Sequence, residues 1–423
     1  MTGEEAVAYI HTFRWQQHPP GLHRIRALLA ALGNPQEALR FIHVAGTNGK
    51  GSTCACISAV LQAAGYRVGL NTSPYLLRFH ERIQVNGEPI PDEALGALTE
   101  RIRPAAEAMP EHPTEFELIT ALAMLYFKEQ RCDIVVLEVG MGGALDASNV
   151  IDVPEVAVLT AMGLDHVREL GPTLSDIAAA KAGIIKPGGT VVSYGGCPEA
   201  DAVFQQVCAQ QRADLRAVDF SRLQAVRSDL EGSFFEFRPY GVLRLSLAGS
   251  YQPKNAAAAV TALEVLRERG WRVTEDTIRQ GLAAVQWPGR FQLLRRAPAF
   301  LLDGAHNPHG MAAAAESLRA AFPGQKPVIL LGVLADKDVA QMLAPLLPLA
   351  SRFFTVRPEN PRAMAAEELA ARLAPAGIPV RACGSVAEGV RRAVAAAGRD
   401  GAVCALGSLY LSGDVQRAVA ELN

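Results

Sequence analysis

Short apolar runs alternate with longer segments of helical periodicity along most of this chain. The first series reads FIHVAG, a helix-like STCACISAVLQAAG and YRVGL, and it continues through DIVVLEVG, VAVLTAM and TVVSY. Short continuous apolar runs are typical of strands buried on both faces, and parallel strands need a crossover segment, usually a helix, between them. The rhythm therefore predicts an α/β fold around a mostly parallel sheet.

A change of pattern divides the chain. Over 213–248 the stretches become shorter, and SFFEFRPYGVLRLSL predicts an antiparallel hairpin turning around Pro239–Gly241. An Ala-rich helix ending at Gly270 is followed by QWPGRFQLL, a candidate hinge, and then by a second βα series that starts with AFLLDGAH. We expect an N-terminal P-loop-type parallel-sheet domain with a small antiparallel subsheet, a hinge and a smaller C-terminal Rossmann-like α/β domain, at 1–288, 289–296 and 297–423 respectively.

Composition limits the partners and the compartment. The 423 residues are 49% hydrophobic and 20% charged, and the net charge of −2 leaves no electrostatic footprint for nucleic acid or an anionic membrane. The N-terminus MTGEEAVAYI lacks a signal-peptide pattern, and no apolar run is long enough to span a bilayer. We expect a cytoplasmic monomer that binds only small molecules. The seven cysteines have no CxxC spacing, so neither a disulfide framework nor a zinc site is predicted.

A glycine-rich turn marks the first candidate site. The strand FIHVAG runs into GTNGKGS, Gly46 to Ser52, and a helical pattern follows at once. Strand, glycine-rich turn and helix in this order favour phosphate binding, because backbone N–H groups and the helix N-terminus can face phosphate oxygens. Lys50 can then reach the terminal phosphates, and Ser52 offers a hydroxyl to Mg²⁺. The alternative is a plain glycine-rich turn with a solvated lysine. The predicted ATP contacts are Gly46, Thr47, Asn48, Gly49, Lys50, Gly51 and Ser52.

The decapeptide HVAGTNGKGS resembles the loop of the folylpolyglutamate synthase and dihydrofolate synthase family, within the Mur ligase superfamily. The resemblance extends over almost the whole chain through TSPYLLRFHERI, LEVGMGGALDASN, GLDHVRELG, AKAGIIKPG, WPGRFQ, DGAHNPHG and GSLYLSGDV. It implies ATP-dependent ligation of L-glutamate to a pterin-containing acceptor, dihydropteroate or folate, with ATP and Mg²⁺ as cofactors. A monovalent cation is a further candidate.

The candidate metal ligands are predicted partly from their positions in the sequence pattern and partly from the family resemblance. Glu138 ends the run DIVVLEV, where a parallel strand delivers a hard oxygen to the carboxyl edge of the sheet; the alternative is a carboxylate that caps the next turn. Only the resemblance makes His166 a candidate metal ligand. The resemblance also implies that Lys181 is carbamylated and binds a second Mg²⁺, which requires a lowered lysine pKa. Asp165 and Lys186 are interpreted as a turn residue and a helix-end cation.

The resemblance assigns further contacts in the second half of the chain. Asp303 and His306 of DGAHNP are expected to position glutamate and phosphate, with Asp303 also touching ATP. Arg290 of WPGRFQ and Asn255 of YQPKN are expected to contact ATP, and a guanidinium suits phosphate recognition. A hinge salt bridge is the other interpretation of Arg290. The predicted catalytic residues are Lys50, Lys181, Asp303 and His306.

Acceptor contacts are expected in two segments. Ser73, Pro74 and Tyr75, with the Glu81–Arg82 pair, match a family loop near the pterin site. TEFELIT looks like a degenerate form of an aromatic-rich family segment, and makes Phe116 a candidate, although a phenylalanine at helical spacing is more often a core residue. His306 is included among the substrate contacts.

One departure concerns the acceptor. The family segment carries arginine within GG-R-x-D-A-T-N, whereas Ala144 stands there in this chain and Ser148 replaces threonine. Two rival functions remain open at this point. A Mur-type ligase acting on a peptidoglycan precursor would share the loop and the lysine, and a regulatory P-loop NTPase would release phosphate with ATP alone.

Overall fold

A computed structural model describes residues 1–13 and 20–422 of the chain. The chain separates into two compact units. Unit 1 comprises 1–221 and 255–285, and unit 2 comprises 222–254 and 286–423. The units divide the chain differently from the predicted domain boundary, because 222–254 belong to unit 2. Within unit 2, Leu230, Ala248 and Tyr251 pack into the same apolar cluster as Met311 and Leu318.

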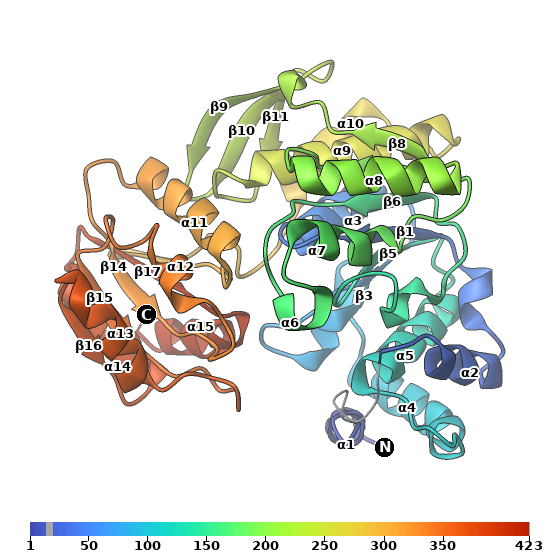
Figure 1. The fold of residues 1–423 in the computed structure, drawn as a ribbon, viewed down its shortest axis with the longest axis horizontal. Coiled ribbons are helices and arrows are strands. Elements are labelled where there is room, and N and C mark those ends of the chain that lie inside the picture. Colours follow the sequence, from blue (N-terminus) through green and yellow to red (C-terminus); the bar gives the residue numbers. More distant parts are fainter. Residues whose placement is uncertain (14–19, 423) are drawn as a thin grey trace. The chain divides into compact units, whose positions relative to one another are not determined.

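Unit 1 is built on an eight-stranded sheet (Figure 1). Its order is β4-β3-β2-β5-β1-β6-β7-β8, and all neighbours are parallel except those of β3 and β4. The strands are β1 Phe41–Ala45, β2 Val68–Asn71, β3 Ile83–Val85, β4 Glu88–Pro89, β5 Ile134–Glu138, β6 Val156–Leu159, β7 Thr190–Ser193 and β8 Asp214–Ala217. The parallel strands predicted from apolar runs are confirmed, and the runs are apolar because helices cover both faces.

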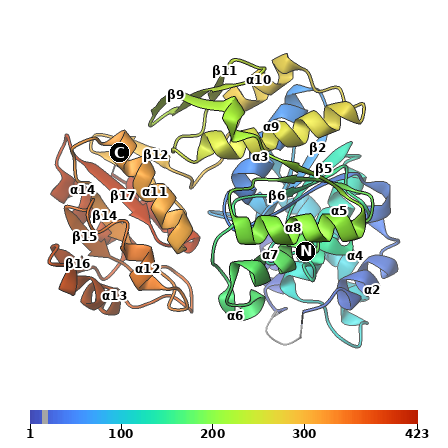
Figure 2. The same cartoon turned by 45° about the horizontal axis from the view of Figure 1, so that its top comes forward.

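The helices of unit 1 pack on the two faces of this sheet. They are α1 Gly3–Ile10, α2 His23–Ala31, α3 Lys50–Ala63, α4 Asp92–Glu107, α5 Glu115–Glu129, α6 Val167–Leu170, α7 Leu174–Ala182, α8 Pro198–Gln211, α9 Gln252–Glu268 and α10 Glu275–Ala284. Figures 1 and 2 both show α7 and α8 side by side, and their alanines and Phe204 pack with β1, β6 and β7. A second cluster joins α1, α2, α4 and α5 to β5.

Unit 2 contains two sheets. The predicted hairpin is confirmed as β10 Gly232–Phe237 and β11 Val242–Leu245, which pair antiparallel and are joined by β9 Leu223–Asp229 in a three-stranded sheet. The second sheet has the order β12-β13-β17-β14-β15-β16. Its strands are β12 Gln292–Arg296, β13 Ala299–Leu302, β14 Val328–Leu331, β15 Arg352–Thr355, β16 Val380–Ala382 and β17 Ala402–Leu406.

The six-stranded sheet is covered on both faces. Along β13, Leu301 faces the cluster formed by α11 Pro308–Ala321, α12 Val339–Leu343 and α13 Ala366–Leu373. Phe300 and Leu302 face the opposite cluster, formed by α14 Val386–Ala397 and α15 Ser412–Ala420. This alternation is what a strand period of two residues requires. The candidate hinge segment 289–296 contains β12, which pairs antiparallel with β13, and a hinge role stays a prediction.

Two further expectations are met within the described residues. All seven cysteines carry free thiols, and all except Cys197 are buried. No helix in residues 1–13 and 20–422 is long and apolar enough to cross a bilayer.

Helices α3 and α10 approach each other without an intervening side chain. A Cβ added to Gly281 of α10 would lie 2.4 Å from Cα of Val60 and 2.6 Å from its backbone nitrogen. Because the atoms in the way are backbone, no rotamer change can make room for a methyl group.

We expect Gly281→Ala to destabilise the protein by about 1 to 3 kcal/mol through overpacking. Alanine normally stabilises a helix interior relative to glycine, so the sign of the change isolates the clash. Urea denaturation measures the free energy of unfolding. Gln280→Ala, an exposed position in the same helix, is the matched control, and equal or greater stability of Gly281→Ala would contradict this packing.

Candidate active site

The glycine-rich turn lies at the carboxyl edge of the central strands of unit 1. It follows β1, which lies between β5 and β6, and α3 begins at Lys50. Gly46 has a φ of 153° and Gly49 a φ of 85°. A Cβ at Gly46 would lie 1.8 Å from Oγ1 of Thr160, and one at Gly49 would lie 2.5 Å from Oδ1 of Asn255. Packing and backbone conformation therefore both require glycine at these two positions.

Backbone hydrogen bonds hold the turn against the segment that follows β6. The N–H groups of Thr47 and Asn48 both donate to the carbonyl oxygen of Ala161, at 3.1 Å each. The Thr47 hydroxyl donates to the carbonyl oxygen of Gly163 at 3.0 Å. Asn255, predicted as an ATP contact, lies beside Gly49, as the close approach of its side chain shows.

Two lysines donate to the same carbonyl oxygen. Lys50 Nζ lies 3.1 Å from the Gly46 oxygen and 3.4 Å from that of Thr47. Lys181 Nζ, from the last turn of α7, lies 2.9 Å from the Gly46 oxygen and is buried. The structure therefore brings these two predicted catalytic residues together at the turn.

The environment of Lys181 favours its neutral amine. Burial, followed by the charge of Lys50, lowers the pKa of Lys181 to about 7, against the opposing influence of Asp165 and Asp146. The lowered pKa expected from the sequence is thus confirmed. Carbamylation itself stays a prediction.

The metal candidates occupy the ends of adjacent strands. Glu138 ends β5 and is 4% exposed, and its Oε2 accepts from the Ser73 N–H at 3.0 Å. Ser52 is buried in the first turn of α3. His166 has a left-handed backbone with a φ of 51°, and its N–H donates to Oδ1 of Asp165 at 2.9 Å. Since β5, β1 and β6 are neighbours, these groups share one edge of the sheet.

These donors fit a Mg²⁺ ion that is shared with substrate phosphates better than an ion held by protein side chains alone. Within the part of the chain that the structure describes, no three His, Cys, Asp or Glu side chains converge to hold an ion. Magnesium usually keeps several waters and binds through one or two carboxylates together with substrate phosphates. A single buried carboxylate, Glu138, and the hydroxyl of Ser52 beside the glycine-rich turn match that pattern.

The loop after β5 is fastened by a buried polar chain that sequence reasoning missed. His43 Nε2 donates to Ser148 Oγ at 2.8 Å, and that hydroxyl donates to Oδ1 of Asp146 at 2.5 Å. Asp146 also accepts from the N–H groups of Met141 and Ser148. Burial lowers the pKa of His43 to about 3, so its ring is neutral. A histidine inside the apolar run FIHVAG was the available signal.

Ala144 and Lys186 belong to the same loop region. Ala144 N–H donates to the carbonyl oxygen of Ala180, next to Lys181, and a Cβ on Gly183 would lie 2.3 Å from Ala144. Lys186 Nζ donates to the Asn149 carbonyl oxygen at 3.2 Å, consistent with its interpretation as a structural cation. The departure at Ala144 therefore lies directly against the end of α7.

Two of the predicted acceptor segments contact the Glu138 region. Ser73 bonds Glu138, and Phe116 packs on Gly140, where an added Cβ would lie 2.6 Å from its Cζ. The Arg82 guanidinium carbon lies 5.2 Å from the centroid of the Tyr75 ring, a distance typical of cation–π contact. Pro74 follows Ser73 through a cis peptide bond.

In unit 2 the predicted residues cluster after β13. Asp303 is 3% exposed; its Oδ2 accepts from the Tyr251 hydroxyl at 2.6 Å and from the Phe291 N–H at 2.9 Å. Arg290 lies over Gly304, where an added Cβ would be 2.0 Å from its Nη1. His306 Nδ1 donates to the Gly304 carbonyl oxygen at 2.8 Å.

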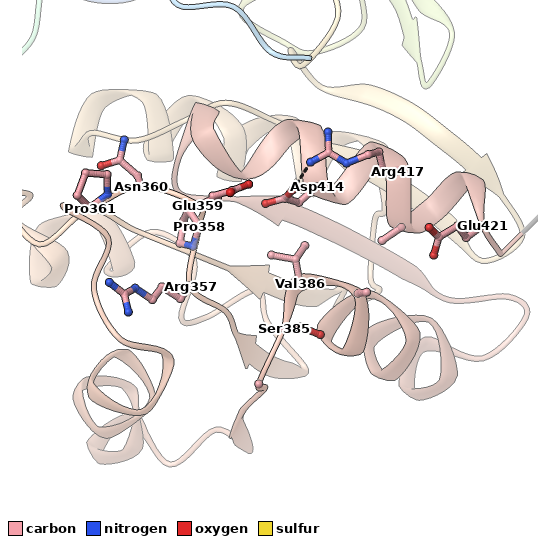
Figure 3. A pocket seen from close by; sticks show the side chains of 13 residues that line it. Arg357, Pro358, Glu359, Asn360, Pro361, Ser385, Val386, Asp414, Arg417 and Glu421 are labelled. Carbon is pink, nitrogen blue, oxygen red and sulfur yellow. Dashed lines mark hydrogen bonds and ion pairs between the residues drawn. The ribbon is translucent and has the colours of Figure 1, made fainter. Parts of the chain in front are cut away.

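A cavity of about 750 Å³ in unit 2 contains none of the predicted site residues (Figure 3). It is lined by the segments after β15 and β16 and by α15, including Arg357, Glu359 and the ion pair of Asp414 with Arg417. Strands β17 and β14 separate β15 from β13. This cavity is therefore separate from the predicted site residues of unit 2.

We expect the stability of the protein to rise with pH above neutrality because of Lys181. Its folded pKa of about 7 lies below the ordinary lysine value of 10.5, so between these values the unfolded chain binds the extra proton. Relative to Lys181→Met, the wild type should gain about 2 kcal/mol from pH 7 to pH 9 and nothing below pH 6. Urea denaturation in bicarbonate-free buffer with EDTA measures this, and a difference independent of pH would contradict it.

Known proteins resemble both units. The family model of the Mur ligase middle domain matches residues 44–263, and that of the Mur ligase glutamate ligase domain matches 289–409. The dihydrofolate synthase/folylpolyglutamate synthase of Bacillus subtilis is 38% identical over 377 residues, which cover 86% of this chain and 87% of that protein.

Solved structures agree over the whole length. Folylpolyglutamate synthase of Mycobacterium tuberculosis, complexed with ADP, superposes with a TM-score of 0.91 at 32% identity and covers 99% of this chain and 98% of its own. Escherichia coli FolC in complex with DHPP and ADP gives a TM-score of 0.86 at 32% identity, covering 100% and 98%. The chain belongs to the Mur ligase family and, within it, to the dihydrofolate synthase/folylpolyglutamate synthase group.

Proposed function

We propose that this enzyme adds L-glutamate to dihydropteroate and to folate (poly)glutamates, with ATP converted to ADP and phosphate. Its family makes it an ATP-dependent ligase of an acid and an amino acid. The observation that carries the proposal is the glycine-rich turn at the sheet edge, with Lys50 and Lys181 on one carbonyl oxygen and Glu138 on the adjacent strand.

The chemistry follows from the need to activate a carboxylate. Amide formation at neutral pH is unfavourable, so ATP first phosphorylates the acceptor carboxylate to an acyl phosphate. The amino group of L-glutamate then attacks, and phosphate leaves from the tetrahedral species. Lys50 and the backbone N–H groups at the start of α3 would bind the transferred phosphate and stabilise its developing charge. No covalent bond to the enzyme is needed.

Magnesium would be held by Ser52 and Glu138, with His166 and a carbamylated Lys181 at a second site. When bound, Mg²⁺ neutralises phosphate charge and orients the phosphates. The lowered pKa of Lys181 supports the modification, because only the neutral amine reacts with CO₂. Asp303, His306, Arg290 and Asn255 would position glutamate and ATP.

The acceptor would bind near Ser73, Pro74, Tyr75, Arg82 and Phe116. The contacts of Ser73 with Glu138 and of Phe116 with Gly140 support a site beside the metal candidate. The E. coli relative solved with DHPP and ADP supports an acceptor containing a pterin. The peptidoglycan and NTPase alternatives lack comparable support. We also propose that the protein is a cytoplasmic monomer.

Product formation should require three substrates at once. We expect sustained ADP release and incorporation of labelled glutamate only when ATP, L-glutamate and a pterin acceptor are all present, because the acyl phosphate forms on the acceptor and is consumed by glutamate. Dihydropteroate and a folate monoglutamate are assayed separately, which shows whether both are used. If no glutamate is incorporated when either acceptor is supplied, the folate assignment is refuted. ADP release with ATP alone would indicate a nucleotide switch.

Lys50→Met should lower kcat by at least about 100-fold, because it removes a preorganised cation from the transferred phosphate. Lys128→Met, on the exposed last turn of α5, is the matched control and should keep wild-type activity. Steady-state kinetics with the better acceptor measure both. Equal activity of the two variants would remove Lys50 from the mechanism.

A further inference from the structure

The Asp303 carboxylate joins three separate chain segments. Oδ2 accepts from the Tyr251 hydroxyl at 2.6 Å and from the Phe291 N–H at 2.9 Å, and Oδ1 accepts from the Ala305 N–H at 2.8 Å. A carboxylate offers about four acceptor positions, so three are already used. Gly249 reinforces the junction, because an added Cβ would lie 3.2 Å from Phe291 Cβ and 3.2 Å from the Tyr251 ring.

Two of these segments lead out of unit 2. The chain passes between the units three times, and two of these crossings, at 254/255 and 285/286, lie close in sequence to the junction. Tyr251 lies just before the first crossing and Phe291 shortly after the second. One buried carboxylate therefore fixes the unit 2 ends of both connecting segments.

The backbone atoms fixed by Asp303 also place two residues proposed to contact substrates. Arg290 precedes Phe291, and its Nη1 donates to the Gly289 carbonyl oxygen at 3.2 Å, an oxygen that also accepts from the Gly304 N–H at 2.8 Å. His306 follows Ala305 and is held by the Gly304 carbonyl oxygen. A shift at Asp303 would thus move both side chains.

Tyr251 supplies the side-chain member of this junction. Its ring packs against the apolar cluster that contains Phe291, Leu301 and Ala305. Burial, followed by the charge of Asp303, raises the pKa of Tyr251 well above its ordinary value, so the phenol remains a donor at neutral pH. A hydrogen bond from a phenol to a buried carboxylate is charge-assisted and stronger than a neutral one.

We propose that Tyr251 is a positioning residue of the nucleotide site: its hydroxyl, acting through the Asp303 carboxylate, sets the backbone that carries Arg290 and His306. The inference rests on the proposed function in taking Asp303, Arg290 and His306 as substrate contacts. Tyr251 touches neither substrate nor metal in this account, and it acts through Asp303 alone.

Binding of the non-hydrolysable ATP analogue AMPPCP with Mg²⁺, measured by calorimetry, tests the proposal on the full chain. We expect Tyr251→Phe to weaken binding roughly tenfold, the order of magnitude for one hydrogen bond to a charged group. Tyr66→Phe is the matched control, since the Tyr66 hydroxyl accepts from the Arg272 N–H at 2.7 Å in unit 1. It should bind AMPPCP like the wild type, with a similar loss of thermal stability.

A double-mutant cycle distinguishes positioning from a general structural effect. Asp303→Asn should weaken AMPPCP binding, and adding Tyr251→Phe to it should cause less than about a twofold further change, because both variants break one junction. The proposal would be overturned if the fold-losses in AMPPCP affinity of the two single variants multiplied in the double variant. Equal AMPPCP affinities of Tyr251→Phe and Tyr66→Phe would also overturn it. Wild-type protein that binds AMPPCP but ligates no glutamate would instead refute the proposed function and leave this test intact.

Discussion

The carbonyl oxygen of Gly46 joins the glycine-rich turn to two helices of unit 1. It accepts hydrogen bonds from the side-chain nitrogens of Lys50 and Lys181, which come from helices more than a hundred residues apart in the chain. The oxygen reaches both only because Gly46 adopts a φ of 153° against Thr160. Burial, followed by the nearby charge of Lys50, disfavours the protonated form of Lys181 and lowers its pKa to about 7. The turn, α7 and the segment after β6 are consequently parts of one arrangement.

Much of the fold was predictable because buried parallel strands are apolar along their whole length. β1, β5, β6 and β7 all coincide with short apolar runs. The short strands β3 and β4 have no such signature, and β8 is largely polar, so they were missed. The grouping of 222–254 with unit 2 depends on tertiary packing of residues such as Leu230 and Ala248. Local periodicity carries no information on such contacts.

In the site, too, local sequence patterns predicted some residues, whereas contacts between distant segments could not be predicted. Glu138 and the GTNGKGS turn could be placed from sequence because carboxyl ends of parallel strands share one edge. Lys181 on its helix looked ordinary, and only the family resemblance singled it out. The chain from His43 through Ser148 to Asp146 depends on β1 lying next to β5, and the junction at Asp303 depends on three distant segments. Neither arrangement leaves a spacing pattern in the sequence.

The close approach of Gly281 to Val60 has a mechanical consequence. α3 starts at the glycine-rich turn, and α10 is the last helix before the chain leaves unit 1 at 285/286. Side chains between packed helices usually act as a soft layer, since they change rotamer when one helix shifts. No such layer separates these two backbones, so α3 and α10 can be displaced only together, as one stiff pair of helices.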